Sequence, residues 1–197
     1  FNTFAVHLNP FTRDGRMWVA QRSFKKAIGP GYWDNCAAGL VGAGEPFGLA
    51  MEREAFEEAG VTPGSLEISF SARNIISRPV HEGWMREIAY ICNAYVEDSF
   101  HPHNMDGEVE RFELLEPEAI IERIEKGRFT FESSLAVLAG LAWQEGLLDL
   151  LDQGRLNANL FRPSKRPGWL PVFFRCLLPD HHQNPGARRS LHASSQS

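Results

Sequence analysis

Residues 39–61 read GLVGAGEPFGLAMEREAFEEAGV and contain the strongest structural signal in the chain. Pro46 stands near the start of a run of good helix formers, and Gly60 ends that run. Proline suits the first turn of a helix, and glycine suits the position just beyond the last turn. The segment therefore predicts a Gly-rich loop that leads into one helix, which stops at Gly60.

The predicted helix is rich in acidic residues, because residues 51–60 contain four glutamates and one arginine. At about 100° per residue, Glu54, Glu57 and Glu58 fall on one side of the helix, where their charges repel each other. This pattern alone is compatible with a solvated face, or with a site for a hard cation such as Mg²⁺ or Mn²⁺. The opposite arc is expected to face the core and comprises Leu49, Ala55, Phe56 and Ala59.

The spacing within residues 39–61 resembles the Nudix box, the signature of hydrolases that act on a diphosphate linked to another moiety. Seven fixed positions match in register, and Ala55 occupies the apolar position between them. The matching residues are Gly39, Glu45, Arg53, Glu54, Glu57, Glu58 and Gly60. The match favours the metal site over the solvated face.

The resemblance implies a catalytic site and a fold. Glu54, Glu57 and Glu58 would be catalytic metal ligands for Mg²⁺, with Mn²⁺ as a substitute, and metal-activated water would cut the diphosphate. Arg53 would be a catalytic residue that orients one carboxylate, although it can also form a simple i,i+4 pair with Glu57. Glu45 would support the Gly-rich loop. The implied fold is an α+β Nudix sandwich, α/β/α, with a mixed and largely antiparallel sheet.

Nudix hydrolases often add a carboxylate from a later loop, as a base or a further metal ligand. Residues 104–115, NMDGEVERFELL, offer Glu108 as the first candidate and Glu110 as the second. Asp106 and Gly107 are typical of a turn. The alternative is that these acids are ordinary loop residues.

Two further segments resemble one branch of the family, the Nudix domain fused to fungal thiamine pyrophosphokinase. These are residues 29–45, GPGYWDNCAAGLVGAGE, and residues 106–115, DGEVERFELL, which follow an inserted Met105. The branch implies a substrate such as an oxidised thiamine diphosphate, besides nucleoside diphosphates linked to another group. Branch members usually carry an additional N-terminal segment, so a missing upstream part is expected before Phe1.

Aromatic and basic side chains outside the box are candidates for substrate binding. Arg78 and Arg86 are predicted to meet phosphate, and Trp84 to stack on a heteroaromatic ring. Lys25 is a further candidate for phosphate. Trp33 and Phe100 are candidates for stacking, with core packing as the alternative.

The rest of the chain mixes strands and helices without an internal repeat. Strands are expected at 3–8, 17–23, 66–77, 86–96 and 111–117, and helices at 118–127 and 132–151. Residues 9–15 and 78–85 are expected to be turns.

Residues 1–152 are predicted to form one Nudix domain. The stretch 161–197 holds five prolines, six basic residues and one acid, so 153–197 is predicted to be a disordered tail.

Composition limits the partners of the protein. The net charge of −5 over 197 residues gives no general attraction to nucleic acid or anionic membranes. The three cysteines show no metal-ligand spacing, and neither a long apolar run nor a signal-peptide pattern is present. We expect a cytoplasmic protein whose partner is a small-molecule diphosphate, with no nucleic acid or membrane partner. A homodimer is considered as well.

Two other functions are compatible with the sequence. One is an enzyme similar to isopentenyl diphosphate isomerase, in which Cys36 would transfer a proton, although Cys36 also suits a small buried apolar position. The other is a non-catalytic Nudix binding domain, but such domains typically lose box glutamates that this chain keeps.

Overall fold

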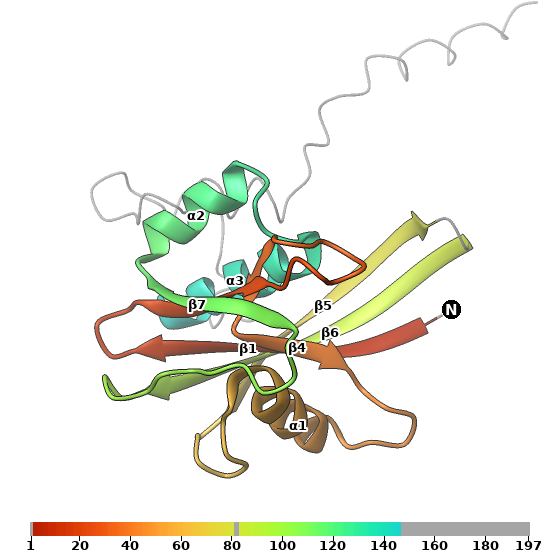
Figure 1. The fold of residues 1–197 in the computed structure, drawn as a ribbon. Helices are drawn as coiled ribbons and strands as arrows, with labels where there is room; N and C mark the ends of the chain where they lie inside the picture. Colours follow the sequence, from red (N-terminus) through yellow and green to blue (C-terminus); the bar gives the residue numbers. More distant parts are fainter. Residues whose placement is uncertain (1, 81–82, 147–197) are drawn as a thin grey trace, which may run out of the picture.

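The computed structural model describes residues 2–80 and 83–146, and these build one mixed sheet between helices (Figure 1). The strands form the path β3-β2-β1-β6-β5, while β4 pairs with β1 and β7 pairs with β2. β1 and β6 are parallel, and the other pairs are antiparallel. The strand bounds are β1 (Asn2–Thr12), β2 (Met17–Arg22), β3 (Trp33–Asn35), β4 (Ala37–Leu40), β5 (Ser69–Val80), β6 (Gly83–Val96) and β7 (Val109–Leu115).

Helices cover both faces of the sheet. Helix α1 (Phe47–Ala59) lies on one face, and α2 (Pro117–Glu125) and α3 (Phe131–Gln144) lie on the other (Figure 1). Each interface has its own apolar core, one around Phe11 and Leu138, and the other around Leu8 and Met51. The predicted α/β/α sandwich is confirmed. The predicted tail, 153–197, lies outside the described residues.

The first hairpin differs from the prediction in length. β1 continues through Asn9 and Pro10 to Thr12, so the turn is confined to the residues before Met17. Asn9 and Phe11 are fully buried on this extended stretch. Burial of the Phe11 ring outweighs the local turn preference of Asn-Pro. The amide of Asn9 is accommodated there by donating hydrogen bonds to Oδ1 of Asn93 and to the carbonyl oxygen of Ala136.

The connector predicted at 78–85 is also shorter in the structure. β5 runs to Val80 and β6 starts at Gly83, and the two strands form an antiparallel ladder. Arg78 therefore pairs with Met85, and Trp84 pairs with Pro79, within the ladder. The expected turn residues belong to the outer end of a long hairpin.

Helix α1 buries only part of the predicted core side, and it also buries two glutamates. Leu49 and Phe56 are exposed, at 57% and 43%, whereas Glu54 and Glu58 are buried. The apolar residues that α1 does bury are small or flexible, and they are Ala50, Met51, Ala55 and Ala59. Because alanines let the helix approach the sheet closely, the carboxylates on that side reach the backbone of β4. The predicted core arc is therefore confirmed for Ala55 and Ala59 and wrong for Leu49 and Phe56.

Candidate active site

The position of Glu54 depends on a missing side chain in β4. Gly39 pairs with Val6 of β1, and α1 packs directly across β4. A Cβ atom at Gly39 would overlap the carboxylate of Glu54. The glycine therefore provides the space that the buried Glu54 side chain occupies.

Arg53 joins the Gly-rich loop to the glutamates of α1. Its Nε lies 2.9 Å from Oε1 of Glu45, and its Nη1 lies 2.6 Å from Oε1 of Glu54 and 3.2 Å from Oε2 of Glu57. Its Nη2 donates to the carbonyl oxygen of Leu40 at 3.1 Å. The guanidinium thus makes the i,i+4 pair with Glu57 and also bonds to Glu54. The catalytic role of Arg53 stays a prediction.

Glu45 closes the loop on itself. Its Oε2 accepts a hydrogen bond from the backbone N–H of Gly42 at 2.8 Å, in addition to the bonds from Arg53. Arg53 first, and then the Gly42 N–H, lower the pKa of Glu45 to about 2. Glu45 is therefore an anion at neutral pH that anchors Arg53, as predicted for a supporting residue.

Glu58 is buried and bonds directly to the backbone of the sheet. It is 9% exposed, and its Oε2 accepts the backbone N–H of Ala38 at 2.8 Å. Removal from water raises its pKa to about 8, despite the opposing effects of the Ala38 N–H and the charge of Lys26. Burial also raises the pKa of Glu54. A buried carboxylate of this kind gains most when a positive charge is placed beside it.

The three carboxylates fit a hard divalent cation in chemistry. Among residues 2–80 and 83–146, however, no three acidic, histidine or cysteine side chains are already gathered into a metal site. Arg53 offers a reason, because its guanidinium bonds to Glu54 and Glu57 and competes with a cation for their oxygens. The ligand set is all oxygen, which suits Mg²⁺ or Mn²⁺.

The loop between β6 and β7 brings Glu108 to the same region. The N–H of His103 donates to the carbonyl oxygen of Ala59, and the N–H of Met105 donates to that of Glu57. Glu108 forms an ion pair with Lys26, and its charge contributes to the raised pKa of Glu54. The loop acid that was the first candidate therefore lies near the box glutamates.

The residues next to Glu108 in this loop form a turn. Asp106 accepts the N–H of Glu108 at 2.8 Å, and Asn104 accepts the N–H of Gly107 at 2.9 Å. Gly107 has a φ of 86°, which favours glycine. The turn predicted for Asp106 and Gly107 is present, and Glu110 is exposed on β7.

A model of the NUDIX domain family matches residues 2–135, which cover this sheet, α1 and the Glu108 loop. This chain belongs to the Nudix family. The enzyme class predicted from the sequence, a Nudix pyrophosphohydrolase, is supported by this match and by the relatives described next.

Two curated proteins illustrate the range of relatives. Nudix hydrolase 20, chloroplastic, of Arabidopsis thaliana is 25% identical over 158 residues, covering 78% of this chain and 42% of that protein. Isopentenyl-diphosphate Delta-isomerase of Leifsonia xyli subsp. xyli is 27% identical over 136 residues, covering 68% of this chain and 71% of the isomerase. The chain thus spans less than half the length of the plant relative.

Solved structures support the fold. The binary complex of a C. elegans Ap4A hydrolase has a TM-score of 0.54 and 19% identity, covering 73% of this chain and 98% of that one. At this level of identity the likeness concerns the arrangement of the Nudix sandwich alone. Within the described part of the chain, no helix has the length and apolar character needed to cross a membrane.

The structure separates the predicted substrate residues from the Nudix glutamates. Arg78, Trp84 and Arg86 lie in the outer part of the β5–β6 hairpin, away from α1 (Figure 1). Trp84 is 61% exposed, and its Nε1 donates to Oγ of Ser77 at 2.8 Å. These three residues stay predictions, and the structure does not bring them together with the glutamates.

Two aromatic candidates for stacking are packed against the cores. Trp33 is buried in β3, where the guanidinium carbon of Arg123 lies 4.1 Å from the ring centroid. Phe100 packs beside Trp18, with 6.4 Å between ring centroids. Both residues therefore fit the alternative given for them, which is packing in the core.

Two functional contributions were missed at the sequence level. Lys26, which follows the phosphate candidate Lys25 in the sequence, forms the ion pair with Glu108, and its charge acts on Glu58. The backbone N–H of Ala38 donates to Glu58. Every residue except proline carries a backbone N–H, so the sequence gives no sign that this one has a role. Adjacent lysines likewise give no signal to choose between them.

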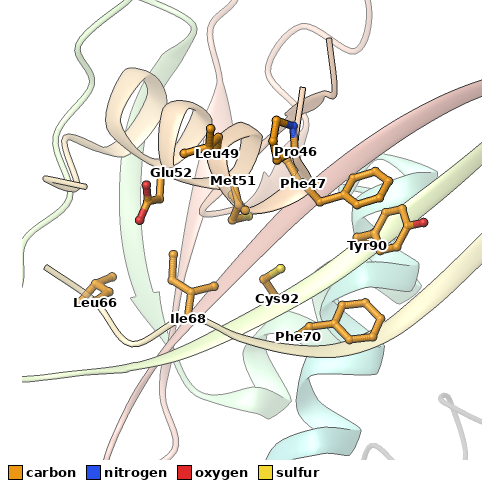
Figure 2. Close-up of a pocket in the computed structure, with 12 residues that line it drawn as sticks. Pro46, Phe47, Leu49, Met51, Glu52, Leu66, Ile68, Phe70, Tyr90 and Cys92 are labelled. Carbon is orange, nitrogen blue, oxygen red and sulfur yellow. The ribbon is translucent and has the colours of Figure 1, made fainter. Parts of the chain in front are cut away.

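An apolar pocket of about 680 Å³ lies on the other flank of α1 (Figure 2). Phe47, Tyr90 and Phe70 line one end, and Glu52 and Leu66 line the other. Positions 52 and 54 point about 160° apart on a helix, so the pocket is separate from the box carboxylates. Glu52, the remaining glutamate of the helix, borders this pocket.

Arg53→Lys is expected to lower kcat by about 10- to 100-fold, the effect typical of losing an orienting partner of a metal ligand. A lysine ammonium cannot replace the planar fork that bonds Glu45 and Glu54 together. The melting temperature should change little, because the Arg53 side chain is 37% exposed. Steady-state kinetics and thermal unfolding measure both quantities.

Arg16→Lys is the matched control for Arg53→Lys. Arg16 pairs with Asp14 at 2.8 Å with a side-chain exposure of 34%, but it lies in the β1–β2 turn. The control should keep wild-type kcat. Wild-type kcat in Arg53→Lys would contradict the orienting role.

Proposed function

We propose that this Nudix domain hydrolyses a diphosphate linkage with a water molecule activated by Mg²⁺, for which Mn²⁺ can substitute. Glu54, Glu57, Glu58 and Glu108 would hold the cation and carry the catalysis. The observation that supports this most is the pair of buried carboxylates, Glu54 and Glu58, held beside Gly39 and the Ala38 N–H. We assign the activity to the predicted domain, residues 1–152.

When bound, the cation would neutralise the diphosphate charge and lower the pKa of a coordinated water. The residues of the chain prepare for this. The Ala38 N–H fixes one oxygen of Glu58. Arg53 aligns Glu54 and Glu57 and is itself anchored by Glu45. Glu108, placed by its loop near Glu54, is the candidate for accepting the proton of the attacking water.

The proposed substrate is a thiamine-diphosphate-like molecule or a nucleoside diphosphate linked to another group. The resemblance of residues 29–45 and 106–115 to the thiamine-related branch supports the first class. A cytoplasmic location and a homodimer stay predictions, as does the absence of nucleic acid and membrane partners.

A substrate panel tests the proposal. Thiamine diphosphate, its oxidised forms, ADP-ribose, NADH and dinucleoside polyphosphates would be incubated with the protein and Mg²⁺, and released phosphate or nucleotide would be measured. Faster turnover of thiamine forms than of nucleotides is expected. Preference for nucleotides would reject the branch and keep the hydrolase, whereas no hydrolysis of any compound would contradict the hydrolase itself.

The similarity to an isopentenyl-diphosphate isomerase makes isomerisation the second candidate. In that reading Cys36 transfers a proton. Cys36 is fully buried, however, and burial, followed by the charge of Glu58, raises the pKa of its thiol far above the usual range. A thiol that stays protonated and enclosed is poorly suited to exchange protons with a substrate.

Cys36→Ala is therefore expected to keep hydrolysis within about twofold of wild type, since the thiol acts as a small apolar group. Initial rates on the best substrate of the panel measure this. Cys92→Ala is the matched control, because Cys92 is also a buried thiol and burial raises its pKa to about 11. Loss of hydrolysis in a folded Cys36→Ala variant alone would contradict this purely apolar role. An isomerase would instead release no phosphate from any compound of the panel.

A further inference from the structure

The side chain of Asn35 is a fully bonded hub inside the domain. It is 1% exposed, and its Nδ2 donates to the carbonyl oxygens of Leu8 at 3.1 Å and Ala37 at 2.7 Å. Its Oδ1 lies 3.0 Å from Nδ1 of His7 and accepts a hydrogen bond from Oγ of Ser133 at 2.9 Å. The two carbonyls decide the orientation of the amide, because a carbonyl can only accept.

The contact with Ala37 leads directly to Glu58. The carbonyl of Ala37 and the N–H of Ala38 belong to one planar peptide group. Asn35 holds the oxygen of that group, and the nitrogen of the same group donates to Oε2 of Glu58 at 2.8 Å. Rotating this peptide would break both bonds together, so Asn35 limits the direction in which the Ala38 N–H can point.

Hydrogen bonds in such a row also strengthen each other. A donor on the carbonyl side polarises the peptide and makes its N–H a better donor. The N–H of Ala38 therefore meets Glu58 with both its direction and its donor strength set from the far side by Asn35. Ser133 of α3 and His7 of β1 hold Asn35 in turn.

We propose that Asn35, held by Ser133, is a positioning residue for the Glu58 carboxylate. It leaves the second oxygen of Glu58 in a fixed place for the divalent cation. The role of the cation rests on the proposed function. The chain of hydrogen bonds from Ser133 through Asn35 and the Ala37–Ala38 peptide to Glu58 does not depend on it. Residues of this kind, which touch a metal ligand only indirectly, typically change metal affinity by about 10- to 100-fold.

Ser133→Ala and Ser134→Ala form a matched pair for the test. Both remove one hydroxyl from the first turns of α3, but Oγ of Ser134 bonds to the carbonyl of Thr130 and does not reach Asn35. Asn35→Asp is the stronger variant, because a carboxylate cannot donate to the Leu8 and Ala37 carbonyls. If Asn35→Asp does not fold, the serine pair still decides the question.

Two measurements are made on each folded variant. Calorimetric titration gives Mn²⁺ affinity, and NMR gives the amide shift of Ala38 in the metal-free protein. We expect about a threefold or greater loss of Mn²⁺ affinity in Ser133→Ala, at least tenfold in Asn35→Asp, and none in Ser134→Ala. The Ala38 amide should shift only in the first two.

Equal Mn²⁺ affinity and an unmoved Ala38 amide in Ser133→Ala and Ser134→Ala would overturn the inference. A wild-type protein that binds Mn²⁺ but hydrolyses nothing in the substrate panel would instead overturn the proposed function. In that case the Mn²⁺ affinities and the Ala38 shifts would still support or reject the role of Asn35. The two failures are therefore distinguishable.

Discussion

Glu58→Gln is expected to lower kcat by about 10³-fold or more while the protein remains folded. Glutamine keeps an oxygen that can accept the Ala38 N–H, so the local structure is preserved. It lacks the negative charge that would hold a cation and offset the charge of the diphosphate. Because burial already raises the pKa of Glu58 to about 8, a neutral amide is well tolerated there.

Kinetics at several Mg²⁺ concentrations and thermal unfolding without metal test this result. Glu52→Gln is the matched control, since it makes the same chemical change on the same helix but on the pocket side. It should keep wild-type turnover. A Glu58→Gln enzyme with near-normal kcat on its best substrate would remove Glu58 from the proposed metal site.

Gly39→Ala is expected to lower activity by about 10²-fold, and to raise the Mg²⁺ concentration needed for half-maximal rate. The added methyl would occupy the space of the Glu54 carboxylate, which must then leave its position beside Arg53. The backbone of β4 and the helix packing leave little room for a compromise. Activity at increasing Mg²⁺ measures both effects.

Gly48→Ala is the control for Gly39→Ala. Gly48 lies in the first turn of α1, and a Cβ there meets no atom within 4 Å. Alanine in a helix is more stable than glycine by up to about 1 kcal/mol, so this variant should be active and slightly more stable. Wild-type Mg²⁺ dependence in Gly39→Ala would show that Glu54 does not need the space at Gly39.

The strength of the sequence prediction differed between local and long-range features. The bounds of α1 followed from Pro46 and Gly60, which act through local backbone geometry, and Gly60 does adopt a left-handed φ of 68°. The spacing of Glu54, Glu57 and Glu58 placed them on one side of that helix. Both results depend only on residues close in sequence.

The direction in which α1 faces the sheet depends on distant residues. The amphipathic pattern pointed to Leu49 and Phe56 as core residues, but both are exposed. The helix instead buries Glu54, because Gly39 on another element makes space and Arg53 compensates part of its charge. A periodic pattern ranks the side chains of one helix by hydrophobicity. It contains no information about the space that the missing side chain of Gly39 leaves on β4.

The prediction of the other site residues was limited in the same way, because their positions also depend on distant parts of the chain. Glu108 was predicted from a resemblance and lies near Glu54, whereas Lys26 was missed. Arg78, Trp84 and Arg86 were chosen for their chemistry, and the ladder of β5 and β6 sets them apart from α1. Asn35 was part of a quoted motif, but its hydrogen bonds join β1, β4 and α3, which sequence spacing does not place together.

The docking of the β6–β7 loop on α1 has a consequence for local unfolding. The carbonyls of Glu57 and Ala59 near the helix end are bonded to the amides of Met105 and His103. Fraying of that end would therefore release the loop, and release of the loop would expose those carbonyls to water. The last turn of α1 and the segment that carries Glu108 should thus open as one cooperative unit, with similar protection against hydrogen exchange at the amides of Gly60, His103 and Met105.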